Sequence, residues 1–188
     1  MDGDRRAKRT ERELKKAFLS LLAEKPIDKI TIKDLTDRAD INRGTFYLHY
    51  TDIYDLFSEI EKETINKVNE ATEKHTPQEL KKDIYPLIHD LFAGIDENRE
   101  IFTMLFENNR NSDFSEKITN AIKIKCYYDW DAIFKDANKD NYGVYSSFII
   151  SGCIGLIRYW VMYGNESVDE ISDMAKRLII SGVDIIKN

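Results

Sequence analysis

The chain has 188 residues, of which 42% are hydrophobic and 33% charged, with 8 glycines, 3 prolines and a net charge of −6. This length is near that of one domain and excludes a large multidomain enzyme. The hydrophobic share is enough for a core and excludes a disordered chain, while the scarcity of turn residues disfavours an all-β fold. Two isolated cysteines, Cys126 and Cys153, exclude a disulfide framework, and we interpret both as buried thiols.

Charge is distributed unevenly along the chain. Residues 1–50 carry a net charge of +3, whereas the remaining 138 residues carry −9. An acidic protein needs a local basic surface to bind nucleic acid, and we expect that surface at the N-terminal end. The candidate cations there are Arg5, Arg6, Lys8, Arg9 and Arg12. No stretch approaches the roughly 18 apolar residues of a membrane span, and no signal core follows the N-terminus, which predicts a cytoplasmic protein with no membrane partner.

The first part of the chain predicts four helices. Apolar residues at helical spacing mark the first, which Pro26 ends, and Thr31, Asn42 and Asp52 are good N-caps for the next three. These helices cover residues 10–25, 33–39, 43–50 and 53–72. The second and third are short and are joined by a tight turn.

The rest of the chain predicts five more helices and no strand. Thr76 and Pro77 form an N-cap and first turn, Pro86 is a candidate kink within that helix, and Ser167 caps the last helix. The first four of these helices cover residues 77–98, 101–106, 113–134 and 144–164, and the fifth follows Ser167. The sequence therefore predicts an all-α fold of about nine helices.

Two short helices joined by a tight turn, with longer helices on either side, are typical of a helix-turn-helix that reads DNA. A small shared core is expected from Leu35, Ala39, Ile41, Phe46 and Tyr50. The residues left facing outward on the second helix are Arg43, Thr45, Tyr47 and His49. Arginine pairs with guanine, threonine contacts a thymine methyl or a phosphate, and tyrosine and histidine donate to phosphates. A helical hairpin within an ordinary core is the alternative.

The string ITIKDLTDRADINRGTFYLHYTDIYDLF, preceded by an amphipathic helix, resembles the N-terminal domain of the TetR family of bacterial transcriptional regulators. The resemblance covers residues 8–68, with the helix-turn-helix at residues 31–50, and leaves residues 69–188 as a helical effector-binding and dimerisation domain. It implies that Thr31 caps its helix against a phosphate. The residues that it implies for binding double-stranded DNA are Thr31, Lys33, Arg43, Gly44, Thr45, Tyr47 and His49.

Two residues depart from the pattern of the family. Asp40 stands in the turn where the family usually has glycine, and aspartate tolerates the left-handed conformation at some cost. Ile53 stands where the family usually has a lysine that contacts phosphate. Loss of that contact is expected to weaken binding at all sequences without relaxing specificity.

The segment FIISGCIGLIRYWVMYGNES resembles one C-terminal subgroup of the same family, in which the last two long helices pair with those of a second subunit. The resemblance implies a homodimer, and a helix this apolar needs cover in a soluble chain. The expected interface residues are Ser151, Gly152, Gly155, Tyr159, Met174 and Leu178. Close packing within one chain is an equal explanation for the three small residues.

The C-terminal region is rich in aromatic residues, which predicts a pocket for a hydrophobic or aromatic effector. The expected lining residues are Tyr85, His89, Phe92, Phe102, Phe106, Tyr127 and Trp130. Plain core packing is the alternative for each of them, and for His89 the alternative is a hydrogen-bonded core histidine.

Catalytic motifs are absent from the sequence. It holds no HExxH metal motif, no glycine-rich phosphate loop and no GxSxG nucleophile motif, and its three histidines lack metal-ligand spacing. We therefore expect no enzyme, no cofactor and no metal site. The expected function is a repressor that binds a palindromic operator as a homodimer and is released by an effector. The alternative is a helical interaction module, or an activator, whose C-terminal domain binds a partner protein.

Overall fold

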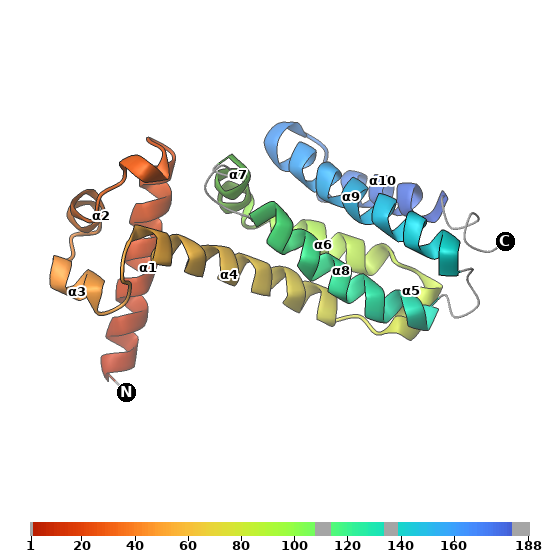
Figure 1. Ribbon diagram of the computed structural model, residues 1–188, viewed down its shortest axis with the longest axis horizontal. Coiled ribbons are helices and arrows are strands. Elements are labelled where there is room, and N and C mark those ends of the chain that lie inside the picture. The colour runs from red at the N-terminus through yellow and green to blue at the C-terminus, as the bar shows by residue number, and fades with distance from the viewer. Residues whose placement is uncertain (1, 108–113, 134–138, 182–188) are drawn as a thin grey trace.

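The computed structural model describes residues 2–107, 114–133 and 139–181. These residues form ten α-helices, one 3-10 turn and no strand, which confirms the all-α prediction. The number exceeds the nine helices expected because one predicted helix is divided in two. Figure 1 shows two groups of helices connected by the long helix α4 (Ile53–Glu73).

The N-terminal group consists of α1, a short 3-10 turn, α2, α3 and the first turns of α4. Their bounds are α1 (Asp2–Leu22), η1 (Ile27–Lys29), α2 (Ile32–Ala39) and α3 (Arg43–Tyr47). Leu14 and Phe18 lie on the buried face of α1, as their spacing predicted. The helix starts well before the predicted residue 10 because the arginine, lysine and alanine residues of the arm are strong helix formers.

The predicted helix over residues 77–98 is wrong as one element. It forms α5 (Pro77–Lys82) and α6 (Tyr85–Asp96), separated by Asp83 and Ile84. Pro86 causes the break, because its ring clashes with the carbonyl group four residues earlier, and that residue is Lys82. Asp83 adopts extended backbone angles, and its carboxylate accepts a hydrogen bond from the backbone N–H of Tyr85 at 2.9 Å. The proline therefore starts a new helix.

The remaining helices complete a three-layered C-terminal group. They are α7 (Arg99–Glu107), α8 (Phe114–Ile133), α9 (Lys139–Tyr163) and α10 (Val168–Ser181). In Figure 1, α4 lies on one side, α6 and α8 lie in the middle, and α9 and α10 lie on the side away from α4. Because α6 packs on both α4 and α10, and α8 on both α4 and α9, the outer faces of α9 and α10 are left at the surface.

The C-terminal end of α9 is closed by Gly164 and Arg99. A Cβ atom on Gly164 would lie 2.8 Å from the Cα atom of Trp160, so a larger residue does not fit. Arg99 of α7 donates to the carbonyl groups of Val161 and Gly164, at 3.4 Å and 2.7 Å, and to that of Trp160. These bonds supply donors to carbonyl groups at the end of the helix, where backbone N–H groups become scarce, although the Trp160 carbonyl also accepts from the Gly164 N–H at 3.0 Å.

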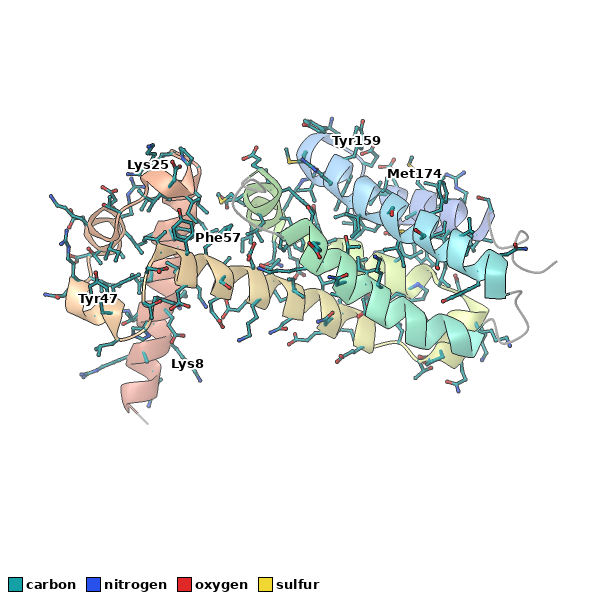
Figure 2. All side chains as sticks on the ribbon, viewed as in Figure 1. Lys8, Lys25, Tyr47, Phe57, Tyr159 and Met174 are labelled. Atoms are coloured by element: carbon teal, nitrogen blue, oxygen red, sulfur yellow. The ribbon has the colours of Figure 1, made fainter. Side chains whose placement is uncertain are left out.

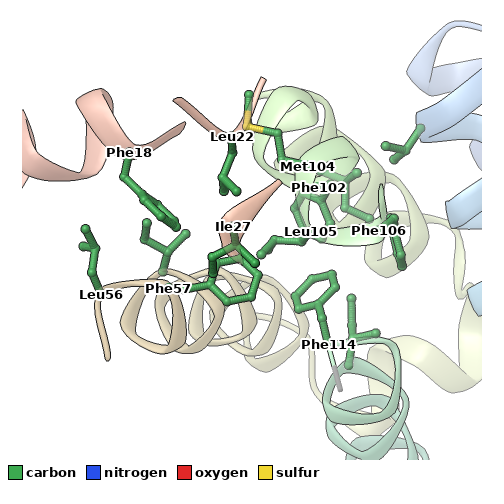
Figure 3. Packing of buried hydrophobic residues seen from close by; sticks show 14 of the residues in the cluster. Phe18, Leu22, Ile27, Leu56, Phe57, Phe102, Met104, Leu105, Phe106 and Phe114 are labelled. Carbon is green, nitrogen blue, oxygen red and sulfur yellow. The ribbon is translucent and has the colours of Figure 1, made fainter. Parts of the chain in front are cut away.

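Aromatic packing joins the two groups of helices (Figure 3). Phe18 of α1 meets Phe57 of α4 edge to face, with ring centroids 6.0 Å apart. Beside them, Phe102, Phe106 and Phe114 from α7 and α8 form a cluster with centroid separations of 5.4 to 6.5 Å. All five belong to one continuous core that extends from α1 to α10. The two groups therefore share a core, and α4 is not a free linker between them.

A buried ion pair also connects α4 with α8. The side chain of Glu61 is 3% exposed, and its Oε2 atom accepts a hydrogen bond from Nζ of Lys117 at 2.7 Å. Its Oε1 atom has no hydrogen-bond partner among the described groups. A carboxylate in this position depends on its cation, because burying an unpaired charge is costly. The pair thus holds α8 at a fixed position on α4.

We expect Lys117→Met to lower the free energy of unfolding by about 2 kcal/mol, because it leaves the Glu61 carboxylate buried without a cation. The loss is smaller than for a fully buried pair because the Lys117 side chain is 38% exposed. Chemical denaturation measures it, and the double variant Glu61→Leu, Lys117→Met should recover most of the stability. A Lys117→Met protein as stable as the wild type would show that the pair contributes nothing.

Candidate functional site

The start of α2 is fixed by a capping box. Thr31 accepts a hydrogen bond from the backbone N–H of Asp34 at 3.1 Å, and the Asp34 carboxylate accepts from the backbone N–H of Thr31 at 2.9 Å. Lys25 also donates to this carboxylate at 2.8 Å. These donors, with Lys25 first, hold the pKa of the Asp34 carboxyl well below its usual range. The cap is therefore formed at every pH near neutrality.

The turn between α2 and α3 is built on Asp40 and Asn42. Asp40 has φ 53° and ψ 48°, the left-handed conformation that the sequence predicted for this position. Asn42 then caps α3, with its side-chain oxygen accepting from the backbone N–H of Gly44 at 2.7 Å. The turn brings α3 across α2 in a fixed orientation.

The predicted core beneath α3 is confirmed. Leu35 and Phe46 are fully buried and Tyr50 is 7% exposed, while Ala39 and Ile41 pack against them from the side. The rings of Phe46 and Tyr50 lie 5.8 Å apart. Burial raises the pKa of the Tyr50 hydroxyl above its ordinary value. This core anchors α3 from below and leaves its opposite face in solvent.

The outward face of α3 carries Arg43, Gly44 and Tyr47, all exposed (Figure 2 labels Tyr47). Thr31 and Lys33 at the start of α2 are exposed as well, whereas Thr45 is half-buried. These residues come from two segments that pack on each other, the start of α2 and α3, and they supply a guanidinium, an ammonium and hydroxyl groups. Such groups pair with phosphate oxygens and base edges in a major groove.

One residue on this surface was missed by the sequence reasoning. Leu48 follows Tyr47 and its side chain is 83% exposed. A choice of DNA-binding residues by their hydrogen-bonding groups passes over it, because leucine has none. Its position one helical turn after Gly44 indicates that Leu48 lies on the same outward face.

The expectation that His49 faces outward is wrong. Its side chain is 13% exposed, and its Nδ1 atom lies 3.2 Å from a carboxylate oxygen of Glu11 on α1. The reason is helical geometry, because residue 49 follows the buried Phe46 by three positions and so shares its face. His49 instead connects α3 to α1.

A stripe of cations runs along α1. Apart from the adjacent pair Lys8 and Arg9, successive members are three or four residues apart, which places the stripe on one helix face, opposite the buried Leu14 and Phe18. All are exposed: Arg5, Lys8, Arg9, Arg12 and Lys16. No acidic residue lies within this stripe, although Arg12 also pairs with Glu13 beside it at 3.1 Å. The basic surface expected at the N-terminal end is thus a helix face (Figure 2 labels Lys8).

The C-terminal group contains an apolar cavity of about 100 Å³. Its walls come from α4, α5, α6, α8, α9 and α10, and they are almost entirely aliphatic, with Phe92 as an aromatic member. Asn69, Thr72 and Cys153 are the polar or thiol-bearing side chains in the lining, and no charged residue belongs to it. Because Val68, Asn69 and Thr72 lie on α4, the cavity is in direct contact with the helix that continues to the helix-turn-helix.

The outer face of α9 and α10 is apolar and exposed. Along α9, Val144, Phe148, Tyr159 and Tyr163 are 56 to 74% exposed and follow each other at multiples of about one helical turn. Leu178 of α10 is 59% exposed beside them. A groove of about 590 Å³ between the two helices is lined by Val144, Phe148, Leu178 and neighbouring residues.

Comparison with known proteins identifies the family. A model described as bacterial regulatory proteins of the tetR family matches residues 16–60, which include α2, α3 and the start of α4. A model described as a transcriptional regulator C-terminal region matches residues 82–181. The chain belongs to the TetR family.

Individual relatives agree with this assignment. The uncharacterized HTH-type transcriptional regulator YxbF of Bacillus subtilis is 39% identical over 79 residues, which are 41% of this chain. The match spans 21% of the length of YxbF. A TetR regulator from Streptococcus agalactiae shares the fold with a TM-score of 0.69 at 18% identity, over 95% of this chain and 98% of that one. The dihydroxyacetone kinase operon activator DhaS has a TM-score of 0.64 at 18% identity, with the same coverage.

The departure of this TetR-family chain at Ile53 has a structural consequence. Ile53 is 6% exposed and packs in the core at the start of α4, so it offers nothing to a phosphate. The next residue, Tyr54, is 50% exposed. The position where the family usually has lysine therefore serves packing in this chain.

The effector pocket expected from aromatic residues differs from the cavity that is present. Of the expected lining, Phe92 contributes to it, while Phe102 and Phe106 are fully buried in the packing that joins α7 to α4 and α8. Tyr127 and Trp130 lie on α8, but their side chains are outside the described residues. The aliphatic residues that do line the cavity lie on the apolar faces that the sequence predicted for these helices. Their spacing does not distinguish a residue that lines a cavity from one that packs against a neighbour.

Tyr85 and His89 belong to a polar cluster between α6 and α10. The Tyr85 hydroxyl donates to Asp169 at 3.1 Å, and the His89 Nε2 atom lies 3.3 Å from the same carboxylate. His89 is half-buried at the helix surface, so the interpretation as a core histidine is wrong. Its apolar sequence neighbours lie on the other faces of α6.

One helix among the described residues, over Asn141–Tyr163 of α9, is long and apolar enough to span a membrane by length and composition. The expectation that no stretch approaches the length of a membrane span is therefore wrong for this helix, because its few polar and charged residues are spread along an otherwise apolar segment. In this fold one side of the helix packs on α8 and α7, and the opposite side is the exposed apolar face described above.

We expect Cys153 to react slowly with thiol reagents, because burial raises the pKa of its thiol to about 11 and the thiolate is the reactive form. In a Cys126→Ser background, alkylation at pH 8 should be roughly a hundredfold slower than for an exposed cysteine. The rate should rise about tenfold per pH unit up to pH 10. A rate that levels off near pH 8.5 would contradict the raised pKa.

Proposed function

We propose that this chain represses transcription by binding a palindromic operator as a homodimer, and that an effector in the C-terminal group releases it. The observation that carries the proposal is the exposed face of α3, where Arg43, Gly44 and Tyr47 stand on a buried core. A helix fixed in this way fits the major groove, with Arg43 paired to a guanine and Tyr47 and Lys33 to phosphates. Its place of action is the cytoplasm.

The basic stripe of α1 supports contacts to the DNA backbone near the helix-turn-helix. It is the face of an otherwise acidic protein where positive charge is concentrated, and Glu11 joins α1 to α3 through His49. Cations on a rigid helix release counterions from DNA without reading its sequence. We therefore propose that the stripe contributes to the affinity for DNA, and that the α3 face determines which sequence is bound.

The exposed face of α9 and α10 supports the homodimer. All six residues expected at the interface are exposed in the single chain, namely Ser151, Gly152, Gly155, Tyr159, Met174 and Leu178. Apolar patches of this kind mark protein interfaces, and the small residues permit close helix approach. The proposed two-fold axis is one that sets two copies of α3 on the same side of the dimer, as a palindrome with half-sites about 34–36 Å apart requires.

The cavity supports an effector that is small, uncharged and largely aliphatic. A charged ligand finds no counter-ion among its lining residues, and Asn69 offers one amide to orient a carbonyl or hydroxyl group. An effector that fits the cavity better in one orientation of α4 shifts the separation of the two α3 helices. A coupling of about 1–3 kcal/mol is enough for roughly 5-fold to 150-fold release.

An activator that binds a partner protein is the second candidate function. The cavity of about 100 Å³ is smaller than the roughly 300–1,000 Å³ of typical ligand pockets, whereas the outer groove is large and apolar. One protein of the same fold is named as an operon activator. Activation of a promoter by this chain in the presence of a partner, with no response to small apolar compounds, would favour this function over repression.

We expect Arg43→Ala to lose specific DNA binding while the fold and the dimer stay intact, because its side chain is exposed and touches no core. Fluorescence anisotropy with duplexes that flank the gene, at two salt concentrations, measures the change. Loss of a bidentate guanine contact should weaken operator binding by about 1–3 kcal/mol. Unchanged affinity for a duplex that the wild type binds specifically would remove Arg43 from the interface.

We expect Phe148→Asp to convert the dimer into a monomer, because it places a charge on the exposed α9 face at the outer groove, where Phe148 is 73% exposed. Sedimentation velocity measures the change. Lys123→Asp is a matched control, since Lys123 is also exposed but lies on α8. A Phe148→Asp protein that remains dimeric would place the interface elsewhere.

A further inference from the structure

We propose that Leu48 reads a thymine methyl group in the operator and so determines part of the sequence specificity. The inference rests on the DNA binding proposed above and adds to it a residue that supplies apolar rather than polar readout.

The first observation is exposure. At 83%, Leu48 is the most exposed large hydrophobic side chain among the described residues. The other highly exposed apolar residues gather mainly on α9 and α10, where they can cover one another in a dimer. Leu48 lies instead on the helix-turn-helix, beside Tyr47. Its apolar surface therefore finds no cover within the chain or in the proposed dimer.

The second observation is that Leu48 is held in place. Its backbone remains helical, with φ −76° and ψ −18°, and its N–H donates to the carbonyl of Thr45 at 3.2 Å. Two residues before it, Phe46 is fully buried, and two residues after it, Tyr50 is 7% exposed. The side chain is thus presented to solvent by a fixed backbone, at the end of the helix that faces the DNA.

The third observation is the space around it. Residues four apart on a helix are neighbours, so Leu48 stands next to Gly44 as Tyr47 stands next to Arg43. Gly44 has no side chain, and a Cβ atom there would meet a single described atom within 4 Å, the Asn42 side-chain oxygen at 3.3 Å. The glycine lets the duplex approach closely on the side of the leucine.

The chemistry of the major groove then selects the target. Guanine, adenine and cytosine present hydrogen-bond donors and acceptors there, and thymine alone adds an apolar group, its C5-methyl. A leucine gains nothing from polar groups but gains from covering a methyl. Burial of one methyl group corresponds to roughly a fourfold change in affinity.

The experiment uses a duplex that the wild-type protein enriches from a random-sequence pool. Each dT in one half-site is replaced in turn by dU, which removes the methyl and leaves base pairing unchanged. Fluorescence anisotropy should show that one such replacement weakens wild-type binding about fourfold. Leu48→Ala should bind the parent duplex more weakly and lose this sensitivity, whereas Leu48→Met, which keeps an apolar side chain, should retain it.

Three results would contradict the inference. Equal dU penalties in the wild type and Leu48→Ala at every position would overturn the inference, as would a wild type insensitive to every replacement. Arg43→Ala serves as the comparison, because it should weaken binding yet keep the dU penalty of the wild type wherever binding is measurable. If the wild type enriches no sequence, the DNA-binding function itself fails and the inference with it.

Discussion

The structure depends on one constraint, the packing of α4 against both groups of helices. The N-terminal turns of α4 carry Phe57 into the core beneath α1, and Glu61 one turn later pairs with Lys117 on α8. Further along, Val68 and Thr72 line the cavity of the C-terminal group. Because a packed core deforms little, a displacement of α4 at the cavity must move the helix-turn-helix as well.

The cavity and the outer groove share a wall. Ile149, Cys153 and Leu156 of α9, with Ala175 and Ile179 of α10, line both of them. Any group that fills the cavity therefore presses on the same residues that a second subunit would cover from outside. For the effector and the dimer that we propose, this arrangement offers two physical routes to the DNA, one through α4 and one through the geometry of the dimer.

Positive and negative charges are concentrated at different ends of the molecule. The basic stripe lies on α1, and the acidic residues dominate the C-terminal group. The division keeps most acidic residues away from the basic stripe, so that a protein with net charge −6 can still attract DNA locally. The polar contact between His49 and Glu11 then helps to fix the orientation of α3 relative to the basic stripe of α1.

The helix-turn-helix could be predicted from the amino-acid sequence alone, because the signals that define it are local. The Thr31 and Asn42 caps, the left-handed Asp40 and the buried Phe46 follow from residue types at fixed short spacing. The tertiary structure alone decided where the cavity lies and which aromatic residues are core. Aliphatic residues from six helices line that cavity, and nothing in the periodicity of one helix tells a residue facing a void from one facing a neighbour. His49, Leu48 and Pro86 differ from the cavity, because the buried face of His49, the exposed face of Leu48 and the break at Pro86 each follow from the spacing of residues three or four positions apart.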